Sequence, residues 1–71
     1  MSTKKVKAVI ALLQERGWIY ERTKGSHRVF VNKETRKTVV VSGKTNDDVP
    51  IGTFKAILRE TGLKESDFFE N

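Results

Sequence analysis

Two very short connections constrain the fold of this chain more than any other feature of its sequence. Three runs rich in β-branched and aromatic residues, 18–23, 27–32 and 37–42, are separated only by residues 24–26 and 33–36. Connections of this length permit hairpins but not crossovers. The three runs are therefore predicted to form an antiparallel meander.

An amphipathic helix is predicted on each side of the meander. In residues 3–16, four apolar residues follow the spacing of one helical face: Val6, Val9, Ile10 and Leu13. Gly17 is expected to stop this helix. Pro50 suits the first turn of the second helix, whose apolar stripe consists of Ile51, Phe54, Ile57 and Leu58. Gly62 is expected to close it, with Leu63 folding back as an apolar cap contact.

The order helix, three strands, helix predicts an α+β fold in which both helices cover one face of the sheet and leave the other free. We expect one domain over residues 1–71, because the chain is short. A domain of this size buries only roughly 60% of the surface that its unfolded chain exposes, so its core is small. In the second strand, alternation separates Phe30 from His27. The Phe30 face is favoured as the core, and the alternative is burial of Val29 and Val31.

Composition narrows the class of protein. The chain has no cysteine, which excludes disulfides and thiolate metal sites. The apolar run at residues 6–13 is interrupted by Lys7 and is too short to span a bilayer. We therefore expect a soluble cytoplasmic protein that needs no cofactor and no metal.

Positive charge is concentrated in the first two thirds of the chain. Residues 1–45 hold eleven Lys and Arg against three Glu, a net charge of +8, whereas residues 46–71 hold three against six acidic residues, a net charge of −3. Such a surface favours a polyanion as ligand. The alternative is a solvated basic face that contributes only solubility.

The segment Gly25-Ser26-His27 contains the only histidine. Imidazole is the side chain that ordinarily exchanges protons between pH 5 and 8. Cleavage of RNA through its own 2′-hydroxyl needs a base, an acid and positive charge around the phosphorus. His27 can fill one proton-transfer role, and Lys24, Lys44, a water molecule or His27 in relay remains for the other. The alternative is an edge histidine that only hydrogen-bonds its turn.

Six further residues are predicted to contact RNA. The turn amides and the nearby basic side chains suit a phosphate, and Lys55 suits a backbone contact one turn into the second helix. The predicted set is Lys24, Gly25, Ser26, Arg28, Lys44 and Lys55.

Two other features leave alternatives. The amides of Gly52 and Thr53 suit a phosphate at a helix N-terminus, or the carboxylates of Asp47 and Asp48 cap them instead. Three aromatic residues are expected in the core rather than on a base-stacking surface, because so small a domain has few other large side chains. They are Trp18, Tyr20 and Phe30.

Several segments, in this order and spacing, carry a resemblance to a known family. They are Arg-Gly-Trp at 16–18, Arg-Thr-Lys-Gly-Ser-His at 22–27, Thr-Val-Val-Val at 38–41, and residues 49–58 with 62–63. The chain resembles HicA-type mRNA interferases, the toxins of HicA–HicB toxin–antitoxin pairs. The resemblance implies a double-stranded-RNA-binding-domain-like fold, cleavage of mRNA with His27 as the catalytic residue, and a HicB-like antitoxin as partner. Many relatives carry a proline or second histidine after the third strand, where this chain has Ser42-Gly43.

Two other functions compete with a toxin endoribonuclease. One is a non-catalytic double-stranded-RNA-binding module, in which His27 contacts RNA without chemistry. The other is an interaction protein whose basic surface docks an acidic partner. A nucleotide hydrolase is disfavoured because the chain has no glycine-rich phosphate loop.

Overall fold

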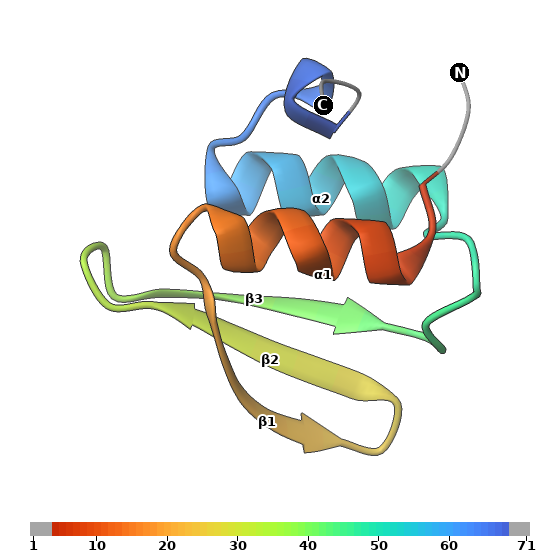
Figure 1. The fold of residues 1–71 in the computed structure, drawn as a ribbon, viewed down its shortest axis with the longest axis horizontal. Helices are drawn as coiled ribbons and strands as arrows, with labels where there is room; N and C mark the ends of the chain where they lie inside the picture. The colour runs from red at the N-terminus through yellow and green to blue at the C-terminus, as the bar shows by residue number, and fades with distance from the viewer. Residues whose placement is uncertain (1–3, 69–71) are drawn as a thin grey trace.

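A three-stranded sheet and two helices form two layers in the computed structural model, which describes residues 4–68 (Figure 1). The elements in chain order are α1 (Val6–Glu15), β1 (Ile19–Lys24), β2 (His27–Asn32), β3 (Lys37–Ser42), α2 (Ile51–Thr61) and a short 3₁₀ helix, η1 (Glu65–Phe68). The predicted order and the α+β class are confirmed. Residue 3, where the first helix was expected to begin, lies outside the described residues, and α1 begins at Val6.

The sheet is an antiparallel meander with strand order β1-β2-β3, as the short connections predict. Strand β1 begins one residue later than predicted and contains a bulge between Tyr20 and Arg22. Strands β2 and β3 pair without interruption from His27 opposite Ser42 to Asn32 opposite Lys37. The central strand is therefore held in register along its whole length by β3.

Both helices lie on the same side of the sheet, which leaves the other side open (Figure 1). Among residues 4–68, ten apolar side chains form the buried core: Val6, Val9, Leu13, Trp18, Phe30, Val39, Val41, Val49, Phe54 and Ile57. Phe30 is 1% exposed, whereas Val29 and Val31 are only half-buried. The side of β2 that carries Phe30 is thus the core side, and the alternative with Val29 and Val31 buried is wrong.

The helix boundaries follow the predicted signals. Helix α1 ends at Glu15 with Arg16 as its C-cap, and Gly17, with φ of +90°, directly follows the cap. Pro50 directly precedes α2, and Gly62 ends it in the left-handed conformation, where its amide donates to the Leu58 carbonyl oxygen at 2.9 Å. Leu63, predicted to fold back onto the end of this helix, packs against the core.

The prediction that all three aromatic residues are buried is wrong for Tyr20. Trp18 and Phe30 are in the core, but Tyr20 is 47% exposed. Tyr20 lies on the edge strand β1 opposite Phe30, and the two rings meet edge-to-face with centroids 5.9 Å apart. An edge position lets one side of the ring cover Phe30 while the other side faces solvent.

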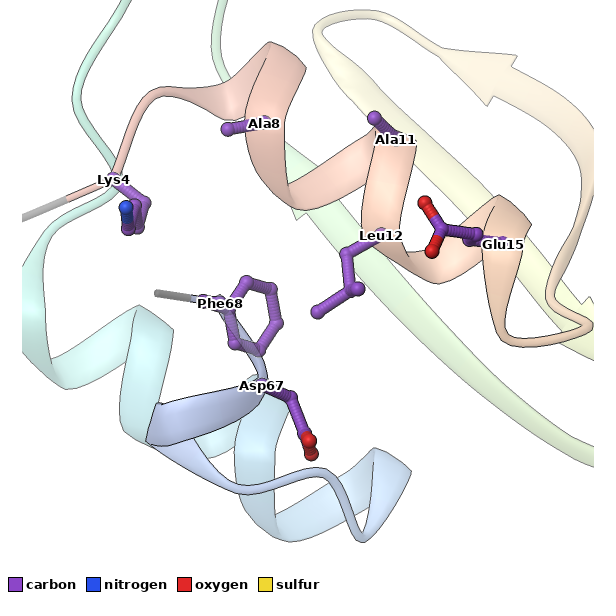
Figure 2. A pocket seen from close by; sticks show the side chains of 7 residues that line it. All are labelled: Lys4, Ala8, Ala11, Leu12, Glu15, Asp67 and Phe68. Carbon is purple, nitrogen blue, oxygen red and sulfur yellow. The ribbon is translucent and has the colours of Figure 1, made fainter. Parts of the chain in front are cut away.

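The 3₁₀ helix η1 was not predicted from the sequence. Its Phe68 packs edge-to-face on Phe54 of α2, with ring centroids 5.0 Å apart. A groove of about 270 Å³ remains between η1 and α1, and Figure 2 shows Phe68 and Leu12 side by side in it. None of the predicted RNA-contacting residues lines this groove.

No helix within residues 4–68 is both long and apolar enough to cross a membrane.

Asp67 holds η1 in place through two contacts. Its carboxylate accepts a hydrogen bond from the Lys64 amide at 2.8 Å, and Arg16 of α1 lies 3.4 Å away. The Lys64 hydrogen bond, followed by the charge of Arg16, lowers the pKa of Asp67 below the ordinary 3.8 despite some opposing desolvation. A carboxyl whose folded pKa is lowered stabilises the fold above its unfolded pKa, and this contribution disappears as the pH falls.

We therefore expect Asp67→Asn to lower the melting temperature at neutral pH, and this difference from the wild-type protein to vanish as the pH falls below about 4. Thermal unfolding followed by circular dichroism between pH 2 and 7 measures both. Glu65→Gln is the matched control, because it removes one carboxylate charge from η1 without these contacts. A melting-temperature difference for Asp67→Asn that does not change with pH would contradict the assignment.

Candidate functional site

His27 is the first residue of β2 and is exposed on the open side of the sheet. It pairs with Lys24 of β1 and with Ser42 of β3. Directly opposed residues of an antiparallel pair share a face, with their Cβ atoms about 4.5–5.5 Å apart. The His27 side chain therefore emerges between those of Lys24 and Ser42 on the same face of the sheet.

The turn before His27 is a two-residue hairpin connection made by Gly25 and Ser26. Gly25 occupies the first central position with φ of +64°, a conformation that favours glycine and suits a tight hairpin. The Ser26 carbonyl oxygen accepts a hydrogen bond from the Gly43 amide at 3.1 Å. This bond joins the turn to the end of β3 and so fixes the turn beside His27.

Ser42 is a site residue that the sequence pattern did not predict. Strand β2 pairs Asn32 with Lys37 across the four-residue connection, and the same register places His27 opposite Ser42. The signal was present in the sequence, because the length of the connection determines the register of a hairpin. Counting back from the connection finds the residue opposite His27.

Arg28 lies on the other face of the sheet from His27. It pairs with the buried Val41, and its Nη1 donates to the Gly43 carbonyl oxygen at 2.8 Å in a half-buried environment. Arg28 therefore joins the start of β2 to the residue that follows β3. The structure brings Lys24, Gly25 and Ser26 next to His27, but it does not bring the Arg28 side chain there.

Lys44 and Lys55 belong to the same end of the molecule as His27. The turn between β1 and β2, the end of β3 and the N-terminal ends of both helices all lie at this end (Figure 1). Both lysines are exposed, Lys44 two residues after β3 and Lys55 in the second turn of α2. The N-terminal ends of helices carry partial positive charge, so this end attracts anions.

The two aspartates before α2 do not cap it, so the predicted capping alternative is wrong. Helix α2 has no side-chain cap. The Asp47 carboxylate accepts a hydrogen bond from the Lys44 amide at 3.0 Å, and Asp48 forms an ion pair with Lys5 at 3.0 Å. Both carboxylates are held by the loop and by the residue before α1. The amides of the first turn of α2 are left without a carboxylate partner among the described residues.

Comparison with known proteins identifies the family. A model of the family described as the HicA toxin of bacterial toxin–antitoxin systems matches residues 6–63. The chain belongs to the HicA toxin family. The matched residues run from the start of α1 to the residue after Gly62, so they include His27 and its flanking residues. No curated protein matches the chain.

Within this HicA chain, the chemistry of the site depends on few groups. Residues 4–68 contain no cluster of three or more His, Cys, Asp or Glu side chains suited to a metal ion. The groups assembled at His27 are one imidazole, one ammonium, one hydroxyl and the amides of the turn. Such a set can exchange protons and stabilise a phosphate.

We expect replacement of Arg28 to lower the stability of the fold, and replacement of Lys24 to leave it nearly unchanged. Arg28→Gln leaves the Gly43 carbonyl oxygen without its charged donor, which should cost about 1 kcal/mol in this half-buried position and lower the melting temperature by about 4 to 8 °C. Lys24→Gln removes the same charge from an exposed position and should change stability by less than about 0.5 kcal/mol. Thermal unfolding of both variants makes the comparison. Equal melting temperatures would show that the Arg28 hydrogen bond does not contribute.

Proposed function

We propose that this HicA-family chain is an mRNA interferase, an endoribonuclease that uses His27 as its proton-transfer residue. The observation that carries the proposal is the position of His27, exposed on the open sheet face between Lys24 and Ser42. A histidine that served only its turn would be expected to hydrogen-bond it. No hydrogen bond joins the His27 side chain to any other residue in the described part of the chain.

The reaction joins the 2′-oxygen of one ribose to the adjacent phosphorus and breaks the bond from phosphorus to the 5′-oxygen. One proton leaves the 2′-hydroxyl and another reaches the 5′-oxygen, so the strand ends in a 2′,3′-cyclic phosphate. His27 accepts the first proton in its neutral form. Lys24, which pairs directly with His27, is one candidate donor for the second, and Lys44, water or a returning His27 are the others.

Positive charge around the phosphorus stabilises the developing negative charge. The Lys24 side chain, opposite His27, and the amides of Gly25 and Ser26, in the turn before it, are the groups that we propose bind the phosphate. Lys44 and Lys55 would contact the RNA backbone farther out at the same end of the molecule. Arg28 belongs to the predicted RNA-contacting set, and its hydrogen bond to Gly43 supports an indirect part in which it holds the turn in place.

His27→Ala should abolish RNA cleavage, and with it toxicity on expression, while leaving the fold intact, because an exposed side chain contributes little packing. Cleavage of a defined RNA by the purified variant, together with its circular dichroism spectrum, measures both. RNA binding should persist in the same variant. Wild-type rates of cleavage by the folded variant would rule out His27 as the catalytic residue, and binding without cleavage by the wild-type protein would favour a non-catalytic RNA-binding module.

A toxin of this family implies an antitoxin partner, and we propose a HicB-like protein that covers the His27 surface. The exposed imidazole and the surrounding positive charge favour a partner that presents carboxylates. Direct coverage of His27 would inhibit cleavage, because RNA and antitoxin would then compete for the same surface.

Complex formation should protect the amides of residues 25–30 from hydrogen exchange and inhibit RNA cleavage in the same sample. The residues of this stretch in the β1–β2 turn are accessible in the free chain, so protection there reports coverage. Exchange followed by mass spectrometry with and without the HicB-like partner measures the effect. Inhibition without added protection would instead favour binding at a distant surface.

A further inference from the structure

A second basic site lies at the end of the molecule opposite His27. A hollow of about 410 Å³ opens between the beginning of β3 and the last turns of α2. Figure 1 shows the β2–β3 connection and the C-terminal end of α2 at this same end. The hollow is lined by Arg36, Lys37, Thr38, Arg59 and Glu60.

The charge of this hollow is positive. Within residues 4–68, no ion pair engages Arg36, Lys37 or Arg59. Glu60 is the one carboxylate that lines the hollow, and the C-terminal end of α2 adds roughly half a negative charge. Three positive charges therefore outweigh about one and a half negative charges.

One wall of the hollow is held in a defined conformation. The Asn32 side-chain Oδ1 accepts hydrogen bonds from the amides of Glu34 and Thr35 at 3.0 and 3.3 Å. The main-chain carbonyl oxygen of Asn32 accepts a third from the Arg36 amide at 2.7 Å. Arg36 itself has φ of +60°, which is uncommon for a residue other than glycine. The connection is thus fixed by local bonds, and it presents Arg36 and Lys37 to the hollow without needing to be ordered by a ligand.

We propose that this hollow binds a backbone phosphate of the same RNA that is cleaved at His27, so that the chain holds its substrate at two places. Arginine and lysine side chains beside a threonine hydroxyl are typical donors to phosphate oxygens. A protein partner would anchor through aromatic or aliphatic side chains in an apolar pocket, and no aromatic or aliphatic side chain lines this one. The inference rests on the proposed RNA cleavage.

The distance between the two sites sets the length of RNA required. His27 pairs with Ser42 and Asn32 with Lys37, so five residue steps of β3 separate the two sites along the strand, about 17 Å at about 3.3 Å per residue. The hollow reaches α2, on the side of the sheet opposite His27, so the RNA must also pass the β3 edge and about 17 Å is a minimum. At about 3.4 Å per stacked nucleotide, the path needs at least about five nucleotides. An RNA of three nucleotides is therefore too short to reach both sites.

The test measures the affinity of 2′-O-methyl RNA, which cannot be cleaved through its 2′-hydroxyl, by fluorescence anisotropy at several salt concentrations. RNAs of about 12 and about 3 nucleotides are compared on the wild-type protein and the Lys37→Gln/Arg59→Gln variant. For single-stranded RNA, each phosphate that the variant no longer binds should lower the salt slope by about 0.7. The drop in affinity of the longer RNA between 50 and 200 mM salt should therefore shrink about 2.6-fold per phosphate, while the affinity of the shorter RNA, which cannot reach both sites at once, should change less.

Two further variants distinguish binding in the hollow from a general effect of the protein's net charge on RNA affinity. Glu60→Gln should strengthen binding of the longer RNA, because it removes the carboxylate from the hollow. Lys64→Gln removes one positive charge outside the hollow, so it should change the salt slope less than Arg59→Gln alone.

The outcomes distinguish this proposal from the proposed cleavage. An unchanged affinity and slope in the double variant, or an equal effect of Lys64→Gln and Arg59→Gln, would overturn the hollow as a phosphate site while leaving cleavage at His27 intact. Absence of binding by the wild-type protein to either RNA would overturn both.

Discussion

Burial of one face of a small sheet under two helices is the constraint on which the rest of the structure depends. Strand β2 is central, and Phe30 on its helix-facing side is 1% exposed. Burying a side chain of this size contributes about 1.5 to 3 kcal/mol. Since side chains alternate along a strand, the burial of Phe30 necessarily places His27 on the open face. A slip of one residue would exchange the two faces, which ties the exposure of the candidate catalytic group to the packing of the core.

The β2–β3 hairpin positions both basic ends of the molecule. At one end it places His27 opposite Ser42, and the Gly43 amide and carbonyl groups there bind Ser26 and Arg28. At the other end, Asn32 organises the connection that leads into Lys37. One continuous ladder thus sets the separation, along the strands, between the two places where we propose that RNA is held. Because His27 lies on the open side of the sheet and the hollow reaches α2 on the other side, this separation is the minimum that an RNA must span.

The aspartate side chains of this protein are paired within the fold, whereas the lysines around His27 and the basic side chains of the hollow are not, in the part of the chain that the structure describes. Three of the acidic side chains in the second part of the chain bind partners within the chain: Asp47 the Lys44 amide, Asp48 Lys5, and Asp67 the Lys64 amide and Arg16. These carboxylates accept hydrogen bonds from main-chain amides or form ion pairs with basic side chains. Within residues 4–68, the lysines around His27 and the basic side chains that line the hollow form no ion pair. Both ends therefore keep basic side chains that no carboxylate neutralises, which favours a polyanionic ligand.

The sequence by itself determined the order of the elements, the antiparallel meander, the ends of the helices at Gly17 and Gly62, and His27 as the candidate for proton transfer. These follow from spacing, turn length and residue chemistry, which act between near neighbours along the chain. Only the tertiary structure decided the placement of Arg28 on the far face, the exposure of Tyr20, the binding partners of the aspartates before α2, and the docking of η1. Most of these depend on which surfaces meet across separations of fourteen or more residues, such as Arg28 with Gly43 and Phe54 with Phe68, and no local pattern encodes such a meeting. One exception is Asp47, whose partner is the Lys44 amide three residues away.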